Sequence, residues 1–500
     1  MAMKATSFSA PTHVMALTHP FITPAYHRAG GIPILIDALS RDYNGGDFWR
    51  LKDEGVINTK AGIIVGNVGH GKSALIKITV LRLMMMSAGF KSMRTVINDY
   101  KSEANESEYG KLSAIAQSVV FRMASMSVNP FETRLFLDNN KKLNILGILN
   151  MAELLAEFSK RSFLSSVEKV ALAIGLGIML NMNEVTWTPA TLEKLMRDLS
   201  RAQIKGHYDQ IDERLAKQLN ARAGKLVNPE LLKITLQQIA LLTSAADNYD
   251  PKEIQDAGVK VSQYYHNLLY GQYGAMFGST HSMYDLYTQR TVTKDWRGLA
   301  PDAETLLRTI DNIIRMTAIE NERKDLLPHL NVDDEVHRPM ENLVYAKNAA
   351  YLSEIARSTS TLYLSATHRL ASIRKGGVGS ELFGFGETVI NNLGFGILGK
   401  QQNDPVVLNE LADRFRLTSA NKNALTTLPP RHFIYVLGDK EPPHLVRTFA
   451  TPMEIEILPT NQANDYMLDR PNPFNDRDVF RYAEENGFVY VPPRESAVVQ

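Results

Sequence analysis

A glycine-rich octapeptide carries the first residues whose types and spacing could do chemistry. It reads G-x-x-x-x-G-K-S and directly follows an apolar run at 61–65. In a phosphate-binding loop of this spacing, glycines let successive backbone N–H groups curl around an anion. We expect Lys72 to reach the β- and γ-phosphates of a nucleotide and Ser73 to ligate Mg²⁺. The predicted nucleotide-binding residues are Gly66, Asn67, Val68, Gly69, His70, Gly71, Lys72, Ser73 and Ala74.

An acidic triplet, Asp333-Asp334-Glu335, follows a mostly apolar run at 326–332. Nucleotide hydrolysis needs one carboxylate in the Mg²⁺ shell and another that activates water. We assign Asp334 to the metal, through water, and Glu335 to the attacking water. Two alternatives stay open: a register in which Asp333 is on the metal side, and a solvated acidic turn without catalytic function.

A third candidate lies after the apolar run at 93–97, where the sequence reads Asp-Tyr-Lys-Ser-Glu and ends at Glu103. Ligands of open α/β sheets bind at the carboxyl ends of the strands. Charged residues are also common in loops, so this signal alone is weak.

The elements around these residues alternate in a regular way. Residues 61–123 have a β-α-β-α-β pattern, which predicts an α/β protein with a mostly parallel sheet flanked by helices. Residues 143–269 have helical periodicity almost throughout, and strand patterns return near 290. We therefore divide the chain into an entry segment laid over the edge of the core (1–60), an ATPase core (61–142 and 270–450), an all-helical insertion (143–269) and an extended C-terminal arm (451–500).

Composition excludes several classes of protein. Lys and Arg total 55 of the 500 residues and Asp and Glu total 54, so net charge provides no general attraction to nucleic acid or anionic lipid. The absence of cysteine rules out disulfides and thiolate chemistry and is consistent with a cytoplasmic location. The longest apolar run, 170–182, is too short to span a bilayer.

The combined order of these motifs resembles the HerA/FtsK superfamily of motor ATPases. Within it, the chain is most similar to the TraC-like assembly ATPases of conjugative type IV secretion systems, of the actinobacterial type. The resemblance rests on the phosphate loop, the Asp99–Glu103 stretch, Asn-Pro-Phe at 129–131, the acidic triplet, the glycine-rich stretch at 376–380 and Leu-Pro-Pro-Arg at 428–431. It implies a RecA-like P-loop fold that hydrolyses ATP with Mg²⁺.

The same resemblance implies roles for individual residues. Lys72 and Ser73 match the phosphate and metal residues, Glu335 matches the catalytic acid, and Glu103 resembles an acidic residue near the attacking water. Two positions depart from the family pattern: Ser102 replaces a glycine, and His368 replaces a glutamine that contacts the γ-phosphate. His368 is therefore a candidate γ-phosphate sensor.

Motors of this superfamily place the nucleotide between subunits of a ring, so an arginine of the next subunit completes the charge on the transition state. The candidates are Arg357, Arg369 and Arg374. For each of them singly, a solvated surface arginine is the better interpretation.

Three functional hypotheses follow. The leading one is a homo-hexameric ATPase that powers conjugative DNA transfer or assembly of the secretion channel, located at the inner face of the cell membrane beside channel proteins. The second is a DNA translocase or coupling protein, although the insertion has no dense basic stripe. The third is a nucleotide-dependent switch or scaffold that hydrolyses ATP negligibly.

Overall fold

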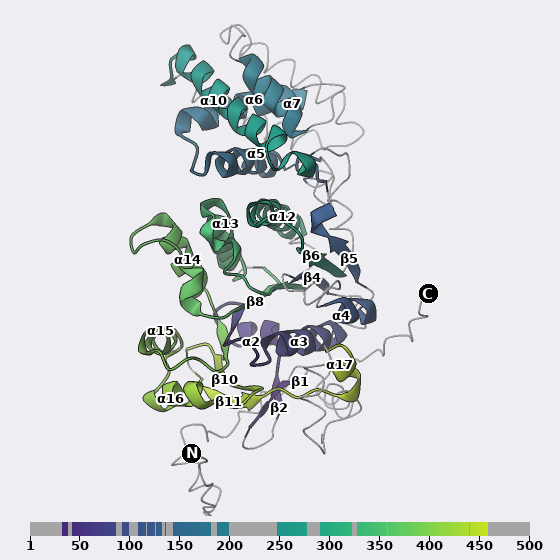
Figure 1. The fold of residues 1–500 in the computed structure, drawn as a ribbon, viewed down its shortest axis with the longest axis vertical. Helices are drawn as coiled ribbons and strands as arrows, with labels where there is room; N and C mark the ends of the chain where they lie inside the picture. Colours follow the sequence, from purple (N-terminus) through teal and green to yellow (C-terminus); the bar gives the residue numbers. More distant parts are fainter. Residues whose placement is uncertain are drawn as a thin grey trace, which may run out of the picture.

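The computed structural model describes residues 33–38, 43–86, 93–99, 109–116, 118–125, 127–132, 136, 144–181, 188–199, 248–277, 291–322, 328–357, 359–439 and 441–458. Its centre is one sheet of 11 strands (Figure 1). The strands are β1 (Pro33–Asp37), β2 (Tyr43–Gly45), β3 (Ala61–Val65), β4 (Arg94–Asp99), β5 (Val119–Arg122), β6 (Thr291–Asp295), β7 (His329–Asp333), β8 (Thr361–Thr367), β9 (Phe395–Leu398), β10 (His432–Leu437) and β11 (His444–Arg447).

The sheet has the order β2-β1-β11-β10-β9-β3-β8-β7-β4-β6-β5. From β9 to β5 all neighbours are parallel, whereas β9, β10, β11, β1 and β2 pair antiparallel. Every residue of β3 and β8 is buried, as expected for parallel strands covered on both faces. The predicted α/β fold with a mostly parallel sheet is confirmed.

Helices cover both faces of this sheet. The described helices, including those of the insertion, are α2 (Phe48–Asp53), α3 (Lys72–Met86), α4 (Gly110–Ile115), α5 (Ile145–Lys160), α6 (Ser166–Asn181), α7 (Pro189–Leu199), α10 (Pro251–Tyr270), α12 (Pro301–Glu322), α13 (Leu343–Ile355), α14 (Glu381–Asn391), α15 (Pro405–Phe415), α16 (Ser419–Thr427) and α17 (Pro452–Glu456). In Figure 1, α3 and α4 lie on one side of the sheet and α12 and α13 on the other.

Apolar residues of α3 and α4 form one buried cluster with the sheet face that they cover. The opposite face is shared by two clusters. One contains α13, α14 and α15, and the other contains α12, β6 and the helices of the insertion. Helix α12 is therefore packed between the sheet and the insertion.

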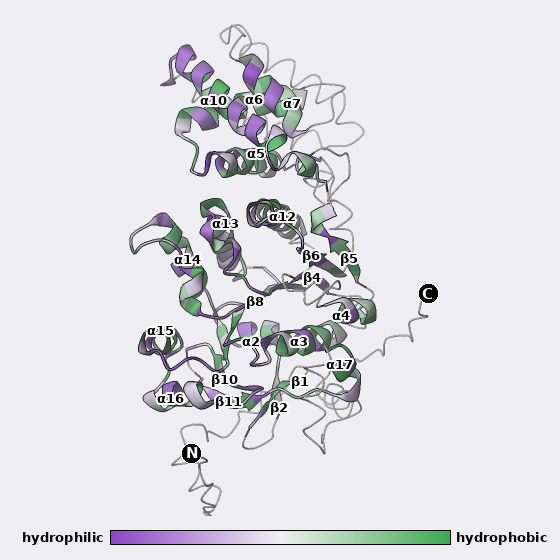
Figure 2. Ribbon diagram, in the orientation of Figure 1, coloured by the Kyte–Doolittle hydropathy of each residue, from purple (hydrophilic) through white to green (hydrophobic). Residues whose placement is uncertain are grey.

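The described part of the insertion, 144–181, 188–199 and 248–277, contains α5, α6, α7 and α10. Helix α10 buries residues three and four apart, among them Ile254, Val261 and Leu268, and Figure 2 shows hydrophilic residues alternating with hydrophobic ones along it. Thr188 caps α7, because its Oγ1 accepts a hydrogen bond from the N–H of Thr191 at 3.1 Å. Residues 200–247 of the expected all-helical insertion lie outside the described residues.

The two ends of the described chain differ from the expectation. Residues 33–37 and 43–45 do not lie over the core but extend its sheet, because β1 pairs with β11 and β2 pairs with β1. The first residues of the expected C-terminal arm form helix α17, which a capping box of Thr451 and Glu454 starts. The packed core therefore includes Ile34, Leu35 and Ile36 of β1 and Ile457 and Leu458 just after α17.

Helix α17 is tied to the phosphate-loop helix by a buried ion pair. The Arg82 guanidinium of α3 donates to both carboxylate oxygens of Glu454, from Nε at 2.6 Å and from Nη2 at 2.7 Å. It also donates to the carbonyls of Ile34 and Phe449 and stacks 3.8 Å from the Phe449 ring. A bidentate, fully hydrogen-bonded geometry is what a buried ion pair requires.

Candidate active site

The phosphate loop leaves β3 at the carboxyl edge of the sheet and enters α3. Gly69 and Gly71 have φ of +77° and +90°, which side chains with a Cβ rarely adopt. The base of the loop is held by the adjacent strands. The N–H of Gly66 donates to the backbone carbonyl of Thr367 at the end of β8, and the N–H of Asn67 donates to the backbone carbonyl of Lys400 just after β9. These contacts place the loop between β8 and β9.

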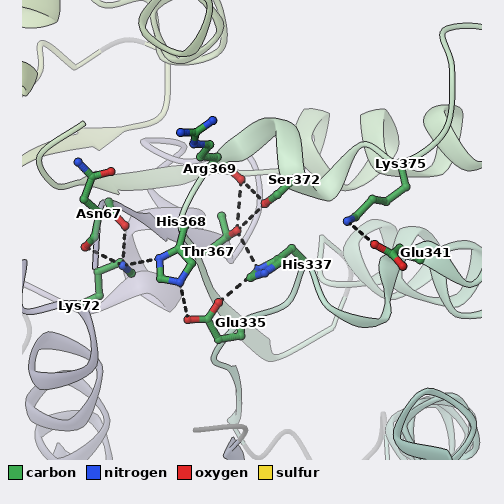
Figure 3. Close-up of polar contacts among 11 residues, drawn as sticks. Asn67, Lys72, Glu335, His337, Glu341, Thr367, His368, Arg369, Ser372 and Lys375 are labelled. Atoms are coloured by element: carbon green, nitrogen blue, oxygen red, sulfur yellow. Dashed lines mark hydrogen bonds and ion pairs between the residues drawn. The ribbon is translucent and has the colours of Figure 1, made fainter. Parts of the chain in front are cut away.

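Lys72 is buried and turned back onto its own loop (Figure 3). Its ammonium donates to the Gly66 carbonyl at 2.5 Å and to the Asn67 carbonyl at 3.0 Å. It also lies 3.1 Å from Nδ1 of His368. The charge of Lys72 is thus satisfied by three acceptors at the position where phosphate oxygens are expected.

The side chain of His70 does not face the nucleotide position in this structure. Its Nε2 lies 2.8 Å from the carbonyl of His432, and its ring packs edge-on against Phe433. Burial lowers the pKa of His70, and the positive charges of Lys72 and Lys400 lower it further. A neutral His70 that donates from Nε2 to the carbonyl fits these surroundings and fastens the loop to β10.

The acidic triplet starts at the last residue of β7. Asp333 is buried, and its carboxylate accepts hydrogen bonds from Asn98 Nδ2 and from the Tyr363 hydroxyl. Trp296 in turn donates to Asn98 Oδ1 at 3.0 Å. Asp333 therefore belongs to a polar network that joins β4, β7 and β8 inside the sheet, and this favours Asp334 over Asp333 on the metal side.

Asp334 is fully buried just beyond β7. The Tyr109 hydroxyl donates to its Oδ2 at 3.5 Å, and the Tyr109 ring lies 5.4 Å from Nζ of Lys77 on α3. Lys77 is one helical turn beyond Ser73, so Tyr109 connects Asp334 to the first turns of α3. A serine hydroxyl and a carboxylate are oxygen ligands of the kind that Mg²⁺ prefers, so this donor set fits the ion.

Glu335 has φ of +58°, an unusual conformation for a residue other than glycine, and its side chain is buried. Two imidazoles approach its carboxylate (Figure 3). His337 Nδ1 lies 3.3 Å from Oε2, and His368 Nε2 lies 3.1 Å from Oε1. Sequence analysis did not identify His337 as a site residue, because a spacing of two residues from Glu335 does not by itself indicate that the two side chains meet.

His368 connects the two halves of the site. A charged Lys72 can only donate, so Nδ1 of His368 accepts and the ring proton is on Nε2, which faces Glu335. The contacts from Lys72 to His368 and from His368 to Glu335 therefore bring together three residues that the sequence analysis singled out separately. Glu103 and Ser102 lie outside the described residues.

The three candidate arginines have different surroundings. Arg369 is exposed beside His368 and donates to Gln402 Oε1 at 2.6 Å. Arg374 forms ion pairs with Glu387 and Glu410 of its own chain. Arg357 is exposed near the amino ends of the strands, where it lines a cavity of about 70 Å³ with Thr59 and Gly394. Among the three, only Arg369 is next to the phosphate loop of its own chain.

The fold and the loop together define an α/β protein of the P-loop NTPase type. Neither a family model nor a curated protein matches the chain. Among solved structures, VirB4 of Thermoanaerobacter pseudethanolicus is similar with a TM-score of 0.57 at 15% identity, covering 85% of this chain and 98% of that one.

The conjugative coupling protein TrwB is a further structural neighbour. Its unbound form gives a TM-score of 0.44 at 12% identity over 78% of this chain and 85% of that one. TrwB with the non-hydrolysable ATP analogue ADPNP gives 0.41 at 11% identity over 79% and 86%. At these identities the likeness to VirB4 shows the fold, and the scores for TrwB add no further argument. Across the described ranges, the longest apolar helices fall short of what a membrane crossing requires.

Proposed function

We propose that this chain is an ATPase of the conjugative type IV secretion class, a ring motor that uses ATP hydrolysis to drive DNA transfer or channel assembly. The observation that carries the proposal is the contact of His368 with both Lys72 and Glu335, because it joins a phosphate-binding cation to a catalytic acid at one edge of the sheet. The VirB4-like fold supports the class.

In the proposed reaction, Lys72 exchanges the loop carbonyls for phosphate oxygens of ATP, whose β-phosphate is cradled by the N–H groups of the loop. Glu335 orients a water molecule, which attacks the γ-phosphorus. The bond to the β,γ-bridging oxygen then breaks, the water proton passes to Glu335, and ADP and phosphate leave. Ser73 and Asp334 would hold Mg²⁺, which neutralises charge on the phosphate oxygens when it is bound.

His368 is proposed as the residue that senses the γ-phosphate. One ring nitrogen of His368 contacts Lys72 and the other faces Glu335. When Lys72 exchanges His368 for a phosphate oxygen, the contact between His368 and the Glu335 carboxylate would therefore change as well. In the same proposal Glu103 lies near the attacking water.

The active form is proposed to be a hexamer docked on channel proteins at the inner face of the membrane. A cation supplied in trans is worth about 10³ to 10⁵ in rate in related phosphoryl transfers. Arg369 lies beside the phosphate loop of its own chain, a position that suits a cation acting in cis. The candidates in trans are therefore Arg357, at the opposite edge of the sheet, and Arg374, which would first have to leave the two glutamates of its own chain.

The test is the ATPase rate of purified protein, with and without single- and double-stranded DNA, measured together with oligomeric mass across a dilution series. Specific activity should fall as the ring dissociates, and Arg357→Ala and Arg369→Ala should each lower it. Activity that depends strongly on DNA would favour a translocase or coupling protein. ATP binding without turnover at any concentration would favour a switch or scaffold.

A further inference from the structure

The two imidazoles around Glu335 are held by different partners. His368 contacts Lys72 of the phosphate loop, whereas Nδ1 of His337 lies 3.3 Å from Oγ1 of Thr367. Thr367 is fully buried and lies 2.8 Å from Ser372 Oγ. Figure 3 shows this second group of contacts on the side of Glu335 away from Lys72.

This difference decides which carboxylate oxygen can be released when ATP binds. Lys72 must leave His368 to reach phosphate oxygens, so the contact between His368 and Oε1 is coupled to the occupancy of the loop. His337 is held instead by Thr367, which in turn contacts Ser372 Oγ, on the side of Glu335 away from Lys72, so the contact to Oε2 can persist. Glu335 would then keep one oxygen fixed and present the other to water.

The backbone explains why such a fixed contact is needed. A left-handed conformation at a residue with a Cβ costs about 1 to 2 kcal/mol, and it persists only where surrounding contacts impose it. A carboxylate held at one oxygen is also restricted in its rotation, and catalysis depends steeply on the position of the reacting group.

We propose that His337 is a positioning residue for Glu335, which holds Oε2 so that Oε1 is directed at the attacking water once His368 has released it. The inference rests on the proposed function, because it assumes that Glu335 activates water. Burial lowers the pKa of His337, which favours the neutral ring. With its proton on Nδ1, the ring can share that proton between Thr367 Oγ1 and Glu335 Oε2, each 3.3 Å away, without the full charge that would reduce the basicity of the carboxylate.

The experiment compares His337→Leu, His337→Asn and His337→Gln in the full-length protein, with kcat and KM for ATP and equilibrium ATP binding as readouts. The Asn amide can occupy the position of Nδ1–H, whereas the Gln amide corresponds to Nε2. We expect His337→Leu and His337→Gln to lower kcat about 10- to 100-fold with ATP affinity within about 2-fold, and His337→Asn to recover most of the loss. His266→Leu on the exposed face of α10 is the matched control.

Three outcomes would overturn the inference. One is a kcat of His337→Leu or His337→Gln within about 2-fold of the wild type, and another is an equal loss in His337→Asn and His337→Gln. If His337→Leu does not fold, the Asn and Gln variants decide the question alone. The third outcome is distinct: a wild-type protein without turnover, or a Glu335→Gln variant as active as the wild type, would refute the proposed chemistry itself.

Discussion

The phosphate half and the acid half of the site are built in different ways. The phosphate half consists of consecutive residues, and its unusual backbone angles fall on glycines such as Gly69 and Gly71. The acid half places a left-handed angle on Glu335, whose carboxylate is approached by His337 two residues further on and by His368 just after β8. A local sequence can form the first half, but tertiary packing must impose the second. Substitutions should therefore affect binding in one half, and chemistry or stability in the other.

The largest effect is expected from Lys72→Ala. The Lys72 ammonium is the cation of the phosphate half, so its removal should reduce ATP binding and turnover below detection. The melting temperature should change by only a few degrees. Isothermal titration with ATP and a thermal melt check both parts, with the exposed Lys260→Ala on α10 as control. Wild-type ATP affinity in Lys72→Ala would show that the loop does not bind phosphate.

Glu335→Gln should separate chemistry from binding in the acid half. The amide cannot take a proton from water, so kcat should drop by about 10²- to 10⁴-fold while ATP and Mg²⁺ still bind. Asp333→Asn is the matched comparison, because it perturbs the buried network with Asn98 and Tyr363 and should act mainly on stability. If Asp333→Asn abolished turnover and Glu335→Gln did not, the catalytic register would be wrong by two residues.

Glu454→Ala tests how far the phosphate half is independent of the rest of the fold. It leaves Arg82 buried without its carboxylate, which should lower the free energy of unfolding by about 3 to 5 kcal/mol. Urea denaturation measures the loss, and ATP affinity below the transition should stay close to wild type. A large loss of affinity in still-folded protein would mean that the loop depends on the packing of α17.

Acidification should destabilise both halves by a smaller amount. Burial lowers the pKa of His70 and of His337, so the unfolded chain binds more protons than the folded one below about pH 6.5. The stabilising contribution is complete above that pH and is lost as pH falls through the lowered pKa, at up to about 1.4 kcal/mol per pH unit for each histidine.

Melting temperatures of wild type, His70→Asn and His337→Asn between pH 7.5 and 5 check this slope, which should be shallower in each variant. Burial raises the pKa of Glu304 to about 6, and this carboxyl changes stability in the opposite direction. All three proteins share that effect, so the differences between them isolate the histidines. Parallel curves would contradict the expectation.

Sequence alone could predict the phosphate half and the parallel sheet, because contiguous glycines and alternating apolar runs are local signals. It could not predict the buried network of Asp333, whose partner Asn98 is 235 residues away. The contact of Lys72 with His368 spans 296 residues, and a left-handed angle on a glutamate has no compositional signature. The sequence shows that Glu335 and His337 are two residues apart, but no local pattern indicates that their side chains meet.

The shared apolar cluster of α12 and the insertion limits how this protein can be shortened. Leu306, Leu307 and Ile310 of α12 are buried in the same cluster as Leu155 and Leu172 of the insertion. Deletion of residues 145–270 would expose these three side chains of α12, whose burial contributes about 1.5 to 3 kcal/mol each, and would leave an apolar surface prone to aggregation. A minimal ATPase would therefore need polar replacements along α12 before it could be handled without aggregation.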